Sequence, residues 1–225
     1  MASRRSRSAG PQPSTAVRAD VKIAARAGLK ACTTYVMVFI HYLHERFPLR
    51  IFGAAATLQT GAAMWASGRE AAPGIISHAA VLSLLLLLQW RVWDDLEDRD
   101  RDRATHPNRV LVRTSPIPFR RALIVLSAIN AALVAVSDSR VALVQIALLN
   151  GASCAAYRAA RFRIPDVAWR FAILPIKYAV FVTIVATVLG APPPGRLVTV
   201  AAVSFASACG YEALHNWHVA AGATS

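Results

Sequence analysis

The chain has 225 residues, of which 56% are hydrophobic, and its formal net charge is +13 at pH 7. Its apolar residues stand in blocks long enough to cross a hydrocarbon core, which takes roughly 20 helical residues, and this excludes an ordinary soluble domain built from amphipathic periods. The basic residues flank those blocks without an aromatic stacking platform, which excludes nucleic acid as a partner and indicates membrane lipid instead.

Two segments are predicted to precede the spanning part. Residues 1–30 are rich in Arg, Ser and Pro and cannot bury a core, so they are predicted to form a disordered basic tail. Residues 31–47 contain an apolar stretch that is short for a span and carries two histidines, which favours an interfacial helix.

Residues 48–216 are predicted to form an all-α transmembrane helix bundle, and residues 217–225 a C-terminal tail. About six apolar blocks are long enough to be spans. They lie at roughly 48–67, 73–93, 119–137, 141–160, 167–190 and 196–214.

The connections between these blocks alternate in charge. The loops 94–118 and 158–166 are rich in arginine, whereas the loops 68–72, 138–140 and 191–196 each carry a single cation. The positive-inside rule therefore predicts that the N-terminal tail and both arginine-rich loops are cytoplasmic. The high Ala and Arg content is typical of a GC-rich bacterial genome, so we expect a multi-pass protein of the bacterial inner membrane.

An acidic stretch follows the second block directly. Asp94, Asp98 and Asp102 stand at i, i+4 and i+8, with Asp95 three residues before Asp98, and are predicted to share one helix face. Carboxylates that converge at a water–lipid boundary suit Mg²⁺, which takes a few carboxylates and completes its octahedron with water and phosphate oxygens.

A solvated, salt-bridged helix end is the alternative for the acidic stretch. Asp95 with Arg99, and Glu97 with Arg101, are ordinary i, i+4 ion pairs. These pairs leave the Asp94, Asp98 and Asp102 positions unexplained, so both interpretations stay open at this point.

The pattern D-D-x-x-D-x-x-x-D, followed by His106-Pro107-Asn108-Arg109, resembles the first signature of the UbiA superfamily of intramembrane prenyltransferases, N-D-x-x-D-x-x-x-D with a later Arg-Pro. The run from Tyr157 to Arg161 is similar to the Tyr-x-x-x-Lys of that family. The resemblance covers about 48–216 and implies part of a nine-helix prenyltransferase fold.

The family's activity is the magnesium-dependent transfer of a prenyl group from a prenyl diphosphate to a lipophilic acceptor within the membrane. By the resemblance, four aspartates are catalytic and hold Mg²⁺: Asp94, Asp95, Asp98 and Asp102. Glu212 is implied as a further ligand of the metal. Arg109, Tyr157 and Arg161 are implied to contact the diphosphate, where Arg161 keeps the charge of the family's lysine and adds a planar fork.

Two departures from the family pattern motivate a second hypothesis. Only Glu212 in the stretch 211–216 is a hard anionic ligand, where the family has a second aspartate-rich motif, and the family has eight or nine spans. The chain is therefore expected to be truncated after the sixth span. The alternative function is a non-catalytic remnant of the fold that binds lipid or a partner protein. A phosphatidyl-type transferase is disfavoured because Asp98 is followed by Arg99 rather than Gly.

Four polar residues stand inside predicted spans. Lys177 is at about mid-membrane depth, where an ionisable residue faces the bundle interior, either as a functional group or simply paired. Asn130 and Asn150 are predicted to form interhelical hydrogen bonds. Gln89, one turn before the acidic stretch, is a candidate for the mouth of the cavity.

Overall fold

The computed structural model describes residues 35–68, 70–160 and 168–222, and these residues contain helices and no strand. The predicted basic tail, residues 1–30, lies outside the described residues. The first described helix covers residues 35–46. The elements that follow it are α2 (Leu49–Ser67), α3 (Pro73–Glu97), α4 (Arg99–Thr105), α5 (Val110–Arg113), α6 (Ile117–Val136), α7 (Arg140–Ala155), the π-helical turns η1 (Ala156–Ala160) and η2 (Trp169–Ile173), α9 (Leu174–Leu189) and α10 (Pro194–Gly222).

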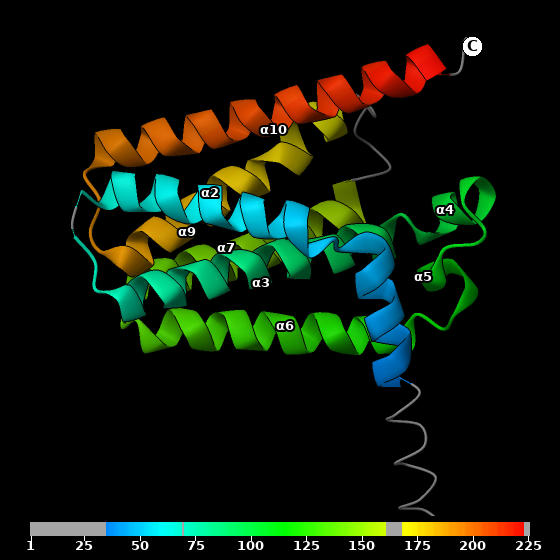
Figure 1. Cartoon of the computed structure of the whole chain (residues 1–225), viewed down its shortest axis with the longest axis horizontal. Coiled ribbons are helices and arrows are strands. Elements are labelled where there is room, and N and C mark those ends of the chain that lie inside the picture. Colours follow the sequence, from blue (N-terminus) through cyan, green and yellow to red (C-terminus); the bar gives the residue numbers. More distant parts are fainter. Residues whose placement is uncertain (1–34, 69, 161–167, 223–225) are drawn as a thin grey trace, which may run out of the picture.

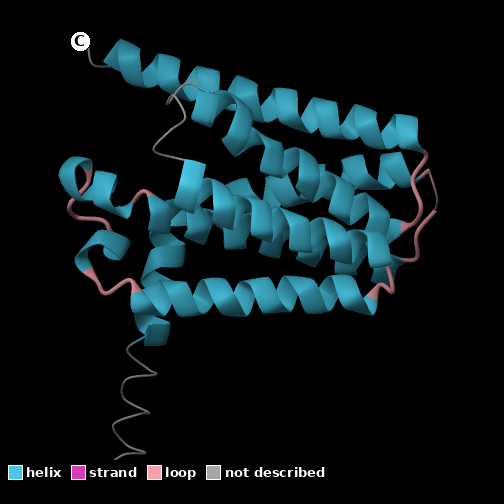
Figure 2. Cartoon of the chain, turned by 180° about the vertical axis from the view of Figure 1, so that it is seen from behind, coloured by secondary structure: helices cyan, strands magenta, loops and turns pink. Residues whose placement is uncertain are grey.

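The long helices run side by side and form a bundle (Figure 1). The short helices α4 and α5 project from one end of it, and loops close the opposite end (Figure 2). The helix 35–46 lies across the same end as α4 and α5, at a steep angle to the bundle (Figure 1). This placement agrees with the geometry expected of an interfacial helix, although the interfacial role itself stays a prediction.

Four helices of the described chain are long and apolar enough to cross a membrane, and their bounds are Pro73–Glu97, Ile117–Val136, Arg140–Arg158 and Pro194–Leu214. The expected all-α membrane protein is therefore confirmed, whereas the count of six spans is not. The predicted span 48–67 forms α2, in which Arg50 and Gln59 interrupt the apolar run. The predicted span 167–190 is divided between η2 and α9, and α9 is about 24 Å long at 1.5 Å per residue, shorter than a hydrocarbon core of about 30 Å.

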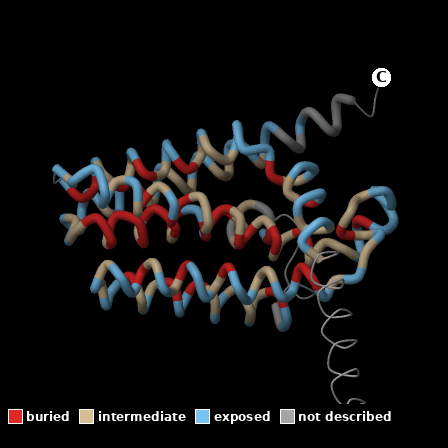
Figure 3. The backbone as a smooth tube through the Cα atoms, turned by 60° about the horizontal axis from the view of Figure 1, so that its bottom comes forward, coloured by how far each residue is buried: buried red, intermediate tan, exposed pale blue. Residues whose placement is uncertain are grey.

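The core of the bundle lies along α3 and α9. Leu82, Leu86 and Trp90 of α3 and Phe181 and Val185 of α9 are fully buried, and Figure 3 shows buried residues concentrated along the central helices. The α10 helix packs against α9, but most of the apolar residues of α10 are exposed. Exposed apolar residues on an outer helix are expected where the surrounding solvent is lipid.

A polar network joins three helices inside the bundle. The Gln89 side chain of α3 accepts a hydrogen bond from Asn130 of α6 at 2.8 Å and donates one to Asn150 of α7, also at 2.8 Å. Gln89 and Asn130 are fully buried. The prediction that Asn130 and Asn150 form interhelical hydrogen bonds is thus confirmed, and Gln89 lies at the centre of the network.

Candidate functional site

Asp94, in the last turn of α3, is contacted from two other helices. The Tyr157 hydroxyl of η1 donates a hydrogen bond to one carboxylate oxygen, and the Lys177 ammonium of α9 forms an ion pair with the other. The Lys177 side chain is 6% exposed and that of Asp94 is 20% exposed. The structure therefore brings the first motif and Tyr157 together, as the sequence predicts, and gives Lys177 a partner in the bundle interior.

Three aromatic rings adjoin this contact. The Tyr157 ring lies 5.7 Å from the Trp93 ring and 5.4 Å from the Trp169 ring, measured between centroids. Tyr157 also interacts electrostatically with the carboxylates of Asp98 and Glu97. Asp94, Glu97 and Asp98 therefore act on the same tyrosine, with aromatic surface beside them.

Asp95 faces a different neighbour, the helix 35–46. Its carboxylate accepts a hydrogen bond from the Tyr42 hydroxyl at 2.9 Å and two from the Arg46 guanidinium, at 2.7 and 3.1 Å. Burial, and then the Asp95 charge, raise the pKa of Tyr42 above its ordinary value. Burial alone would lower the pKa of Arg46, but its hydrogen bond to Asp95 and the Asp95 charge together outweigh burial and raise it.

Asp102 lies with Asp95 rather than with Asp94. It forms an ion pair with Arg109, and Arg46 interacts electrostatically with both Asp95 and Asp102. In an α-helix, side chains seven positions apart differ in direction by about 20° around the helix axis, whereas side chains eight positions apart differ by about 80°. The i+7 pair of Asp95 and Asp102 is therefore closer in direction than the i+8 pair of Asp94 and Asp102, on which the predicted stripe depends.

The remaining predicted residues are dispersed. Arg109 lies beside Asp102, and Arg161 is outside the described residues. Glu212 is a half-buried residue of α10 that interacts electrostatically with Tyr178 of α9. Asp94 acts electrostatically on the same Tyr178, but no hydrogen bond or ion pair joins Glu212 to the first motif in the described part of the chain.

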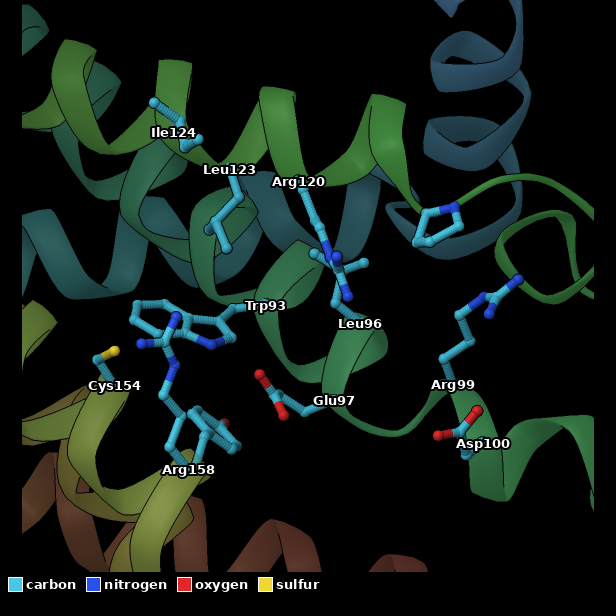
Figure 4. Close-up of a pocket in the computed structure, with 12 residues that line it drawn as sticks. Trp93, Leu96, Glu97, Arg99, Asp100, Arg120, Leu123, Ile124, Cys154 and Arg158 are labelled. Carbon is cyan, nitrogen blue, oxygen red and sulfur yellow. The ribbon is translucent and has the colours of Figure 1, made fainter.

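A cavity of about 620 Å³ opens between α3, α6 and the end of α7. Trp93, Leu123 and Ile124 supply apolar walls. The charged lining residues are three arginines and two carboxylates: Arg99, Arg120, Arg158, Glu97 and Asp100. In Figure 4, Arg120 and Leu123 extend from α6 toward the space that also receives Trp93 and Arg158. The sequence interpretation did not select these residues, because arginines in loops were assigned to topology; the arginine pair 120–121 at the start of an apolar block was the available signal.

The donor set suits magnesium only in part. No group of three or more His, Cys, Asp or Glu residues is placed to hold a metal ion within the described residues, and the Asp95 and Asp102 carboxylates are paired with arginines. Mg²⁺ at phosphate sites commonly takes only one or two carboxylates, with phosphate and water as the other ligands. Asp94 and Asp98, one helical turn apart and both acting electrostatically on Tyr157, are the remaining carboxylates of the motif, and Asp94 is itself paired with Lys177.

Comparison with family models, with curated proteins and with solved structures finds no match to this chain. The resemblance to the UbiA superfamily therefore stays a prediction from the two sequence motifs.

Proposed function

We propose that this protein binds a prenyl diphosphate at the α3–α6–α7 cavity and transfers the prenyl group to a lipophilic acceptor within the membrane. The observation that carries the proposal is the contact between Asp94 and Tyr157, which are 63 residues apart and belong to the two motifs. The motifs were identified without reference to each other's position in space, so their meeting is independent support.

The chemistry of the cavity supports the same ligand. A prenyl diphosphate has an anionic head and an apolar tail, and the cavity offers Arg120 and Arg158 beside Trp93, Leu123 and Ile124. Its volume of about 620 Å³ is within the range of roughly 300–1,000 Å³ typical of small-molecule sites. In this proposal the arginines contact diphosphate oxygens, and the apolar side chains contact the first isoprene units.

The residues around Asp94 would serve the departure of the diphosphate. Asp94 and Asp98 are the residues that would hold Mg²⁺, which would supply positive charge to stabilise the departing diphosphate. Arg120 and Arg158 would stabilise the same charge from the cavity wall, as preorganised cations do most effectively where water is excluded. The faces of Trp93 and Tyr157 would stabilise the cation-like allylic carbon by cation–π interaction.

Arg109 and Arg161 stay as proposed diphosphate contacts, although Arg109 pairs with Asp102 in this structure. The proposed topology has six spans with the acidic motif on the cytoplasmic side, in the inner membrane of a bacterium. It counts α2 and the η2–α9 segment as spans in addition to the four long apolar helices. The distribution of arginine in the loops supports that orientation.

Diphosphate release by the purified protein tests the proposal. The protein in detergent is given Mg²⁺ and radiolabelled farnesyl or geranylgeranyl diphosphate, and both binding and diphosphate release are measured. Asp98→Asn and Arg158→Gln are expected to lower turnover by about 100-fold, the usual loss when one group that stabilises transition-state charge is removed. Asp138→Asn is the matched control, because Asp138 lies in the α6–α7 turn and its left-handed φ of 55° is tolerated by Asn. Unchanged turnover in both site variants would contradict the proposal.

The non-catalytic alternative has its own support in the structure. Asp94, Asp95 and Asp102 are each paired with a cationic side chain, as in a salt-bridged structural helix end. A protein of this kind would bind the labelled prenyl diphosphate, or phospholipid alone, without releasing diphosphate at any Mg²⁺ concentration. That result would favour the remnant of the fold over the enzyme.

A further inference from the structure

The Asp95 carboxylate is saturated by groups that do not face the cavity. Tyr42 and Arg46 donate three hydrogen bonds to it, and the Arg91 guanidinium lies 3.4 Å from one of its oxygens. Asp95 is only 5% exposed. A metal ion at Asp95 would have to displace a buried tyrosine hydroxyl and two arginine side chains, which makes this carboxylate a poor candidate ligand.

The helix 35–46, which Asp95 holds, is fixed to further elements. Tyr42 packs edge-on against Phe119 of α6, with ring centroids 5.2 Å apart. The Glu45 carboxylate accepts a hydrogen bond from the backbone N–H of Val110, the first residue of α5, at 2.9 Å. The helix therefore connects the end of α3 to the start of both α6 and α5.

The α5 segment in turn borders the cavity. Arg99 donates hydrogen bonds to the backbone carbonyls of Leu111 and Thr114, each at 3.0 Å, and so joins the start of α4 to the end of α5. Arg99 and Pro116 are both lining residues of the cavity. A continuous set of contacts therefore runs from Asp95 through the helix 35–46 and α5 to the cavity wall.

We infer that Asp95 is a positioning residue, which fixes the helix 35–46 and through it the α4–α5 side of the cavity, and that it does not bind metal. The effect of Asp95 on the kinetics rests on the proposed function, whereas its effect on the position of the helix 35–46 does not depend on that function. The aspartates of this region then have two roles on two faces. Asp94 and Asp98 act on the ligand, whereas Asp95 and Asp102 fix the surrounding segments.

Accessibility of the helix 35–46 gives a test without any activity. Leu43, which packs against the core, is replaced by Cys in a protein whose three native cysteines are replaced by Ala, and the rate of maleimide labelling is measured in detergent. Asp95→Asn is expected to raise the rate at least about tenfold, because it weakens two hydrogen bonds from a charged donor. Asp98→Asn removes the same charge from the other face and is expected to change the rate less than about twofold.

Kinetics provide the second test. Asp95→Asn and Arg46→Gln are each expected to raise KM for the prenyl diphosphate, and the double variant to raise it no further, since both remove one contact. The Mg²⁺ concentration for half-maximal turnover should stay within about twofold in these variants and rise in Asp98→Asn.

An increased Mg²⁺ requirement in Asp95→Asn, or labelling of Leu43→Cys that Asp95→Asn leaves unchanged, would overturn the inference. If Asp95→Asn does not fold, Tyr42→Phe removes a single hydrogen bond and should give a smaller rise in labelling. Absence of turnover in the wild-type protein would refute the proposed function alone, because the labelling result is independent of it.

Discussion

The ion pair between Lys177 and Asp94 gives the most direct energetic prediction. Lys177→Met removes a cation whose side chain is 6% exposed and leaves the Asp94 carboxylate, 20% exposed, with only the Tyr157 hydroxyl as partner. Breaking a buried pair from one side costs about 3–5 kcal/mol. Asp94 keeps some contact with solvent, so the lower end applies, and we expect a loss of about 3 kcal/mol in the free energy of unfolding.

The variant Asp94→Asn and the double variant distinguish the energy of the ion pair from the packing energy of the two side chains. Asp94→Asn keeps an acceptor for Tyr157 but leaves Lys177, the more buried partner, uncompensated, so the expected loss is at least as large, about 3–4 kcal/mol. Asp94→Asn with Lys177→Met removes both charges together, and the expected loss is only about 1 kcal/mol, because replacing a buried pair as a whole is often close to neutral.

Unfolding in mixed detergent micelles of increasing SDS content, followed by tryptophan fluorescence, measures all four proteins under one condition. The double variant should be more stable than Lys177→Met alone. Losses that simply add, within about 0.5 kcal/mol, would refute the claim that Lys177 and Asp94 stabilise the fold through each other.

Three further outcomes are expected. Gln89→Leu leaves the amides of Asn130 and Asn150 without their shared partner, and should cost about 1 kcal/mol in the same unfolding assay, the scale of hydrogen bonds between membrane helices. Tyr42 has a raised pKa in the folded protein, so its contribution is complete below the unfolded value of about 10 and is lost as the pH rises further; between pH 9 and 11 the thermal midpoint should therefore fall more in the wild type than in Tyr42→Phe. Leu123→Trp fills the apolar part of the cavity, and should weaken binding of geranylgeranyl diphosphate at least about tenfold while leaving pyrophosphate binding unchanged.

The sequence predicts those features that depend on local pattern or on residue type within an apolar block. The helical membrane bundle follows from the apolar runs, and the hydrogen bonds of Asn130 and Asn150 follow from the cost of unpaired amides in hydrocarbon. The meeting of Asp94 with Tyr157 follows from placing both motifs at the same end of the bundle.

The sequence did not predict that the aspartates divide between two sets of partners, because those partners come from distant segments. Arg46, which fixes Asp95, is 49 residues away and belongs to a helix interpreted only as interfacial. The role of Arg120 in the cavity wall was missed for a related reason, since a cation beside an apolar block satisfies the topology rule wherever its side chain points. The count of six spans is not confirmed, because Arg50 and the η2 turn shorten the apolar runs of two predicted spans.

The two π-helical turns lie on either side of the segment 161–167, and Tyr157 of η1 and Trp169 of η2 contact each other. A π turn is equivalent to one residue inserted into an α-helix, and the insertion rotates every side chain that follows. Deleting Ala159 would therefore let η1 relax into α-helix. The directions of the side chains within η1 thus depend on an irregularity of the backbone, and a length change of one residue there would alter them more than most side-chain replacements.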